Sequence, residues 1–126
     1  MRVTLDRDLD ALTERIIGTA FEVFKTLGHG FVEAVCKKAF LCELRERCLD
    51  AEQEVPFQIG HTGSNVGTCF ADIVVARRVI VELKVAEALA PPHKRQVINY
   101  LRASGLPVGL LFNFGSPSLT FARILP

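Results

Sequence analysis

The pattern of apolar and polar residues changes twice along the chain, and each change marks a different kind of element. From about Leu5 to Leu27, apolar side chains recur at three- and four-residue steps, which predicts an amphipathic helix. Thr4 or Asp6 is suited to cap the start of this helix, and Gly28-His29-Gly30 predicts its end. The expected buried stripe is Leu5, Leu9, Leu12, Ile16, Ala20, Val23 and Leu27.

A second helix is predicted over about residues 31–48, after which the apolar period falls to two, the period of a strand. Strands are predicted at 52–59, 67–76 and 79–85. Pro56 places the first strand at a sheet edge, because proline cannot donate to a ladder. The other two are almost continuously apolar, which predicts burial on both faces. The buried face expected of the helix is Val32, Val35, Cys36, Ala39, Phe40 and Leu44.

The sequence GHTGSN is predicted as a loop between the first two strands, and Ala76, Arg77 and Arg78 as the turn of an antiparallel hairpin. A third helix should start at Pro91-Pro92 and run to about Ser104. Strands at 107–114 and 119–125 complete the order ααβββαβ(β). This order indicates one α/β domain over residues 1–126, with a central mixed sheet flanked by helices.

Composition excludes several classes of protein. At 49% hydrophobic and 23% charged residues the chain is globular, and no apolar run reaches the ~18 residues of a membrane span. The sequence MRVTLDRDLDALTERII has no signal-peptide core, so we expect a cytoplasmic protein without a membrane partner. The net charge of +1 means that nucleic-acid binding would need a local basic patch.

The four cysteines do not form a metal-binding or redox motif. They show no C-x-x-C pair and no Cys/His cluster with zinc spacing. We expect small buried hydrophobic residues in a reducing compartment. They are Cys36, Cys42, Cys48 and Cys69.

Candidate chemistry concentrates on the predicted hairpin. Strand alternation places Glu82 and Lys84 on one face, and the three-residue turn places Asp72 opposite Glu82. Opposed carboxylates are costly, and three explanations stay open. Either the register differs by one residue, so that the side chains do not meet; or they form a structural ion cluster; or they form a site for Mg²⁺ or Mn²⁺, for which carboxylates are suitable ligands. In the third case Lys84 would orient a water or stabilise charge on a phosphate.

Two helices offer further polar candidates. Glu33 lies in the first turn of the second helix, where it is either a third carboxylate of the site or an ordinary first-turn glutamate. Gln96 and Tyr100 lie one turn apart on the third helix, on a face into which His93 leads. They form either a surface hydrogen bond or a contact for a phosphate or water.

Basic residues fall into two groups. One group is predicted to form a phosphate-binding rim: Arg77, Arg78, Lys94, Arg95 and Arg102. The other group, on the second helix, is interpreted as a solvated face: Lys37, Lys38, Arg45 and Arg47.

The arrangement D-x9-E-x-K, preceded by a helix that carries Glu33, resembles the core of the PD-(D/E)XK nuclease superfamily. A closer resemblance, to the small bacterial and archaeal proteins of the GxxExxY family, covers about Leu9 to Ile124. It rests on the stretches LTERIIGTAFEVFKTLGHGFVEAVCKKAFLCELRERCL, ADIVVARRVIVELKV and HKRQVINYLRASGLPVGLLFNFGSP. The resemblance implies a restriction-endonuclease-like fold and Mg²⁺-dependent phosphodiester hydrolysis.

Carried over by position, the resemblance assigns roles to individual residues. It implies that Glu33, Asp72 and Glu82 are the metal-site carboxylates, that Lys84 is the catalytic lysine and that Gln96 is the glutamine of the next helix. Candidate substrate contacts are His93, Asn99, Tyr100, Arg77, Arg78, Lys94 and Arg95. The chain departs from the family pattern at three positions, with Cys36 in place of a tyrosine, Phe24 in place of a histidine and His29 in place of a proline.

The leading hypothesis is therefore a metal-dependent nuclease whose substrate is nucleic acid, with DNA favoured. The alternative is a nucleic-acid-binding or interaction module that keeps the nuclease fold without full activity. A third reading is a structural subunit in which the ion cluster only holds the sheet together. So small a domain can hardly enclose duplex DNA, which points to a homodimer or a protein partner.

Overall fold

The computed structural model of the protein describes residues 7–126 and contains one five-stranded sheet between helices. The strands follow in space the order β1-β2-β3-β4-β5; β3 and β4 are parallel, and the other neighbours are antiparallel. The predicted mixed sheet and element order, including the last strand, are confirmed. The elements are α1 (Arg7–Leu27), α2 (Glu33–Glu46), β1 (Ala51–His61), β2 (Ser64–Val75), β3 (Val79–Lys84), α3 (Pro91–Ser104), β4 (Val108–Asn113) and β5 (Thr120–Ile124).

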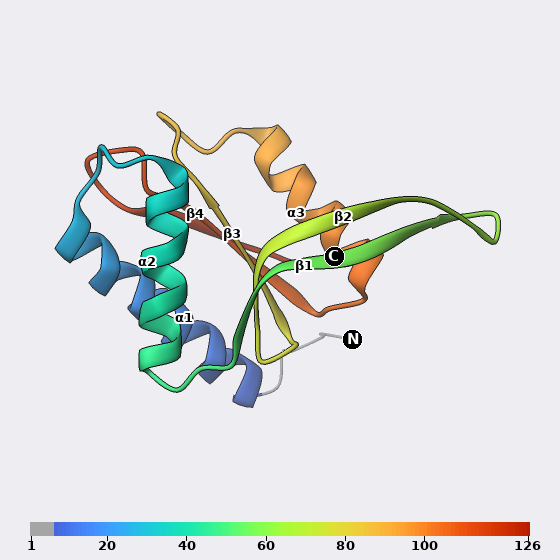
Figure 1. Ribbon diagram of the computed structural model, residues 1–126, viewed down its shortest axis with the longest axis horizontal. Helices are drawn as coiled ribbons and strands as arrows, with labels where there is room; N and C mark the ends of the chain where they lie inside the picture. The colour runs from blue at the N-terminus through green and yellow to red at the C-terminus, as the bar shows by residue number, and fades with distance from the viewer. Residues whose placement is uncertain (1–6) are drawn as a thin grey trace.

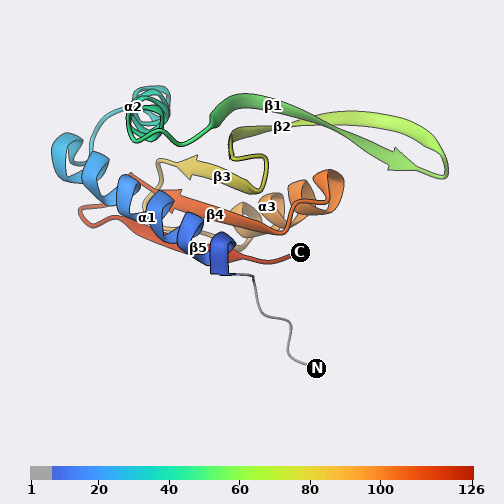
Figure 2. The same ribbon diagram turned by 90° about the horizontal axis from the view of Figure 1, so that it is seen from below.

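The helices cover opposite faces of the sheet. Helices α1 and α2 lie on one face and α3 on the other (Figures 1 and 2). Alternation along β3 divides its side chains between two cores, with Val81 and Leu83 facing α1 and α2, and Ile80 facing α3. The first core is centred on Phe40, whose ring lies 5.3 Å from that of Phe112 in an edge-on contact.

Helix α1 follows its predicted pattern. Its buried residues include Leu9, Ile16, Ala20 and Val23. It ends at Gly28, whose φ of 68° is in the left-handed region that glycine adopts at low cost. The predicted start at Leu5 and the capping residues Thr4 and Asp6 lie outside the described residues.

Helix α2 differs from its prediction in its start and its buried face. It begins at Glu33, and its buried residues are Cys36, Phe40, Leu41 and Leu44. Val32 and Val35 are 66% and 42% exposed, so their predicted burial is wrong. Val32 precedes the helix in extended conformation, and Val35 is one residue, about 100° around the helix, from the line of Cys36 and Phe40.

The cysteines also differ from expectation. All four are free, but only Cys36 is buried, and Cys69 is partly exposed. Cys42 and Cys48 are exposed, because Cys42 lies on the outer side of α2 and Cys48 lies beyond its end.

Strands β1 and β2 form a long hairpin arm that projects beyond the helices (Figures 1 and 2). The sequence GHTGSN is not a loop. It belongs to the two strands and to a tight turn in which Thr62 and Gly63 both have positive φ. Pro56 lies in the edge strand as predicted. The outer half of β2, from Ser64 to Phe70, is largely exposed, so burial on both faces is confirmed for β3 but is wrong for that half of β2.

Over residues 7–126, none of the helices combines the length and the apolar character that crossing a bilayer requires.

Gly109 in β4 sets how closely α3 approaches the sheet. A Cβ atom at this position would lie 2.5 Å from Cγ1 of Val97 in α3. We expect Gly109→Ala to lower the free energy of unfolding by about 1–3 kcal/mol, because the added methyl overpacks this contact. Gly18→Ala is the matched control, since nothing lies within 4 Å of a Cβ there in α1. It should stabilise the protein by roughly 0.5–1 kcal/mol. Urea denaturation of both variants measures the two values, and equal effects would contradict the close approach.

Candidate active site

The regular ladder between β2 and β3 ends at the Ile73–Val81 pair, and two carboxylates take its place. The N–H of Asp72 donates to Oε2 of Glu82 at 2.6 Å, and the N–H of Leu83 donates to Oδ2 of Asp72 at 3.0 Å. The predicted hairpin register and the placement of Asp72 beside Glu82 are therefore confirmed. The bonds are reciprocal, since each carboxylate accepts a backbone N–H from the opposite strand.

Asp72 also faces an irregularity on its other side. The β1–β2 ladder pairs Gln53 with Ile73 and Val55 with Ala71 but skips the intervening residues, Glu54 and Asp72. Glu54 has a φ of 50°, which bends β1 at this point. Asp72 is thus not part of the regular residue pairing with either β1 or β3, and its N–H is available to bind Glu82.

Burial makes Glu82 an unusual carboxyl group. It is 2% exposed, and desolvation together with the charge of Asp72 raises its pKa to about 8, although the N–H of Asp72 and the charge of Lys84 act in the opposite direction. The raised pKa favours the protonated form of this carboxyl group at neutral pH. Such a pair can exchange a proton or bind a cation.

Helix α2 brings an ammonium group to this pair that sequence reasoning missed. Nζ of Lys37 lies 2.9 Å from Oδ1 of Asp72 and 3.2 Å from Oε2 of Glu33. The interpretation of Lys37 as part of a solvated face is therefore wrong. Its i,i+4 spacing from Glu33 was the available signal, because it places both side chains on one face of the helix. Lys38, the next residue, is exposed.

Helix α3 approaches the carboxylates from the other face of the sheet. Gln96 and Tyr100 are hydrogen-bonded, and the pKa of Tyr100 is raised by burial and then by the charges of Glu82, Cys69 and Asp72. The Gln96–Tyr100 pair therefore faces the site. His93 has a structural contact, since its Nδ1 accepts the N–H of Ala90 at 3.0 Å and ties the start of α3.

A buried amide holds the segment between Lys84 and α3. Oδ1 of Asn113 accepts the N–H of Ala86 at 3.0 Å, and Nδ2 of Asn113 donates to the carbonyl of Ala86 at 3.0 Å. Asn113 is fully buried in β4, beside Lys84 on β3. The sequence contained a signal for it, a single polar side chain inside the apolar run PVGLLFNF.

The two arginines of the hairpin turn are not brought to the carboxylates. Arg77 and Arg78 lie at the opposite end of β3 from Lys84, and Arg78 is four residue steps, roughly 13 Å along the strand, from Glu82. Nε of Arg77 lies 3.6 Å from Oε1 of Glu52.

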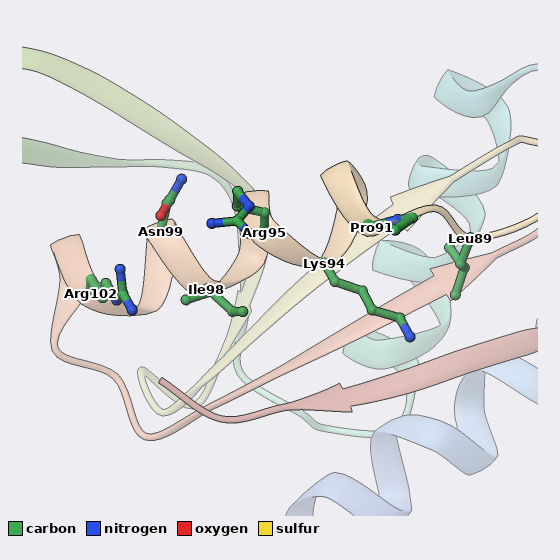
Figure 3. A pocket seen from close by; sticks show the side chains of 7 residues that line it. All are labelled: Leu89, Pro91, Lys94, Arg95, Ile98, Asn99 and Arg102. Carbon is green, nitrogen blue, oxygen red and sulfur yellow. The ribbon is translucent and has the colours of Figure 1, made fainter.

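The cations of α3 line a shallow hollow of about 260 Å³. Figure 3 shows the side chains of Lys94, Arg95, Asn99 and Arg102 along the length of the helix. The helix carries no acidic residue, and across residues 7–126 none of the three cations forms an ion pair. This is the local basic patch that a chain of nearly neutral charge requires for a polyanion.

The predicted three-carboxylate metal set is brought together only in part. The described part of the chain contains no group of three His, Cys, Asp or Glu side chains placed to hold a metal ion. Glu33 is joined to Asp72 through Lys37 rather than directly. Asp72 and Glu82 still fit Mg²⁺ or Mn²⁺, because a cation would offset both the burial and the charge of Asp72, which together raise the pKa of Glu82.

Of the three residues that depart from the pattern of the resembling family, Cys36 lies in the core and Phe24 packs against it, whereas His29 is exposed. Cys36 is fully buried, with its Sγ 3.9 Å from the carbonyl oxygen of Phe31. The ring of Phe24 lies 5.6 Å from that of Phe114, edge to face. Both side chains pack apolar surface behind α2 rather than presenting a polar group to Glu33.

Comparison with known proteins supports the fold. The family model of the PD-(D/E)XK nuclease superfamily matches residues 10–124. The crystal structure of a protein named SSO0001 superimposes with a TM-score of 0.53 at 15% identity, covering 91% of this chain and 78% of that one. No curated protein matches. The likeness to SSO0001 is one of fold, and the five-stranded mixed sheet agrees with the restriction-endonuclease-like architecture.

The raised pKa of Glu82 makes stability depend on pH. Because the folded pKa, about 8, exceeds the ordinary value of 4.5, the folded state binds the proton more tightly than the unfolded state does. Stability from this group is complete below about pH 4.5 and is lost as the pH rises to about 8. Wild type should lose about 4 kcal/mol of stability between pH 5 and pH 9, and Glu82→Gln, which keeps an acceptor for Asp72, should not show this loss.

Chemical denaturation across this range measures the difference. Glu87→Gln is the control, because Glu87 is exposed and its variant should follow the wild-type profile. Parallel profiles for wild type and Glu82→Gln would show that Glu82 is already ionised near pH 7.

Proposed function

Because the chain belongs to the PD-(D/E)XK nuclease superfamily, we propose that it hydrolyses phosphodiester bonds in nucleic acid, with DNA as the expected substrate. The observation that carries this proposal is the reciprocal link between Asp72 and Glu82, with Lys84 two residues farther along β3. Within the superfamily we place it in the GxxExxY family on the motifs around Glu33 and Glu82.

PD-(D/E)XK nucleases generally use divalent metals, and we assign Asp72 and Glu82 as the residues that hold Mg²⁺ or Mn²⁺. When bound, the ion would polarise a phosphate oxygen and lower the pKa of a bound water. A bound cation would favour the ionised form of Glu82, because its charge would offset the burial and the charge of Asp72 that raise the pKa of this group. Lys84, whose charge already acts on Glu82, would orient the attacking water or stabilise the phosphate. Glu33 acts through Lys37.

Helix α3 supplies the polar surface of the same site. The Gln96–Tyr100 pair faces the carboxylates and would position a phosphate oxygen or a water. Lys94, Arg95 and Arg102, with Asn99, would bind the backbone next to the scissile bond. His93 would contact substrate only through the ring nitrogen that does not cap α3. Arg77 and Arg78 would contact the nucleic-acid backbone farther from the scissile bond.

A binding module without turnover is the second candidate. It is favoured by Lys37, which separates Glu33 from the other two acids. A homodimer or a protein partner in the cytoplasm fits either candidate, because a domain of 126 residues can hardly enclose a duplex.

Cleavage assays test the first candidate. Single-stranded, duplex and branched DNA, together with RNA, would be incubated with the protein in Mg²⁺ or Mn²⁺ and analysed on denaturing gels. We expect Lys84→Ala to lower the rate by about 10²–10³-fold, the usual effect of removing one charge-stabilising group. EDTA should abolish cleavage, and Lys38→Ala should match wild type because Lys38 is exposed on α2. If Lys84→Ala cuts as fast as wild type, or nothing is cut, the nuclease proposal fails.

Binding assays in EDTA test the role of α3. We expect the double variant Lys94→Glu, Arg95→Glu to bind DNA more weakly and with a flatter dependence of log K on log salt, by roughly 1–2 units of slope. The double variant Arg7→Glu, Lys25→Glu is the matched control, since it changes the net charge equally and both residues are exposed cations on α1, across the sheet. Equal losses in the two variants would assign the effect to net charge and not to α3. Salt-dependent binding without turnover supports the second candidate.

A further inference from the structure

Lys37 is held by more than an ordinary surface ion pair. Its side chain is 27% exposed, and that of its partner Asp72 is 11% exposed. Burial lowers the pKa of Lys37, but the hydrogen bonds and charges of Asp72 and Glu33 outweigh this effect, and the pKa is raised. The ammonium group is therefore a fixed positive charge between two acids that belong to different elements.

Asp72 divides its two oxygen atoms between this ammonium and the sheet. Oδ2 accepts the N–H of Leu83, and Oδ1 lies 2.9 Å from Nζ of Lys37. Any cation that used Asp72 would therefore compete with Lys37 for Oδ1 or with the backbone for Oδ2. Of these two competitors, the Lys37 side chain is more easily moved than the backbone N–H of Leu83, because it is flexible and partly exposed.

We propose that Lys37 is a resident counter-cation of the site, and that a divalent ion binds Asp72 only by displacing the Lys37 ammonium group. This inference rests on the proposed function. Two positive charges within a few ångströms of each other in a partly buried site repel strongly, so both cannot keep the same oxygen. Glu33, one helical turn from Lys37, retains the displaced ammonium group. Glu33 is then a positioning residue for Lys37 and not a metal ligand.

A metal titration tests the competition directly. Mn²⁺ binding would be measured by electron paramagnetic resonance for wild type, Lys37→Met and Lys38→Met, without nucleic acid. We expect Lys37→Met to bind Mn²⁺ at least about tenfold more tightly than wild type, because the competing charge is gone. Lys38→Met should match wild type. Lys37→Arg keeps the cation and should not gain affinity. Circular dichroism and melting curves establish that each variant is folded.

Amine labelling of the wild-type protein tests displacement. The extent of acetylation by an N-hydroxysuccinimide ester would be measured at each lysine by mass spectrometry, with and without saturating Mg²⁺. We expect labelling of Lys37 to rise several-fold with Mg²⁺, since release exposes the amine, and labelling of Lys38 to stay constant in the same molecule. Unchanged labelling at Lys37 would show that the ion binds without moving it, which overturns the inference.

The Asp72→Asn variant separates the inference from the function. If Asp72→Asn binds Mn²⁺ as tightly as wild type, the metal site assigned to Asp72 and Glu82 fails, and the inference fails with it. If Asp72→Asn loses Mn²⁺ binding while Lys37→Met gains none, the metal site stands and the inference about Lys37 alone is overturned.

Discussion

The backbone N–H groups of Asp72 and Leu83 donate to carboxylates where regular strands would donate to each other's carbonyl groups. The rest of the site depends on this exchange. A hydrogen bond to a charged group contributes about 1.5–3 kcal/mol, which only partly offsets the cost of burying a carboxylate. Burial and the charge of Asp72 therefore keep the pKa of Glu82 well above its ordinary value. The sheet holds the two acids in fixed positions, and side chains of other elements supply the groups that interact with their charge.

These side chains come from helices on both faces of the sheet. The irregularity at Asp72 opens the sheet at the level where α2 carries Lys37 and α3 carries Tyr100. The position of α3 depends in turn on Gly109, which allows Val97 to reach β4, and on Asn113, which holds the segment after Lys84. The polar groups of the site thus come from four elements, each placed by apolar packing that has no part in the chemistry.

Sequence reasoning reached the acids of the hairpin because their positions follow from local rules. Strand alternation and a three-residue turn are enough to place Asp72 beside Glu82. The length of the hairpin arm was underestimated, because its turn places Thr62, which is not a glycine, at a left-handed φ that the sequence does not predict. Lys37 was missed because a basic residue on an amphipathic helix is usually solvated, and only the tertiary packing of α2 shows that it meets Asp72. The role of Arg77 and Arg78 was overestimated, since a residue count along the strand separates the turn from the acids.

The hairpin arm also carries features that limit strand pairing between copies of this protein. Strand β1 is at the end of the sheet, and an open edge of this length offers a row of backbone groups to any other strand. Two features interrupt that row, Pro56, which has no N–H, and Glu54, where β1 bends. An incoming strand could pair with only a few residues before the pattern breaks. The arm can therefore extend into solvent without joining the arms of other copies into a continuous, fibre-like sheet.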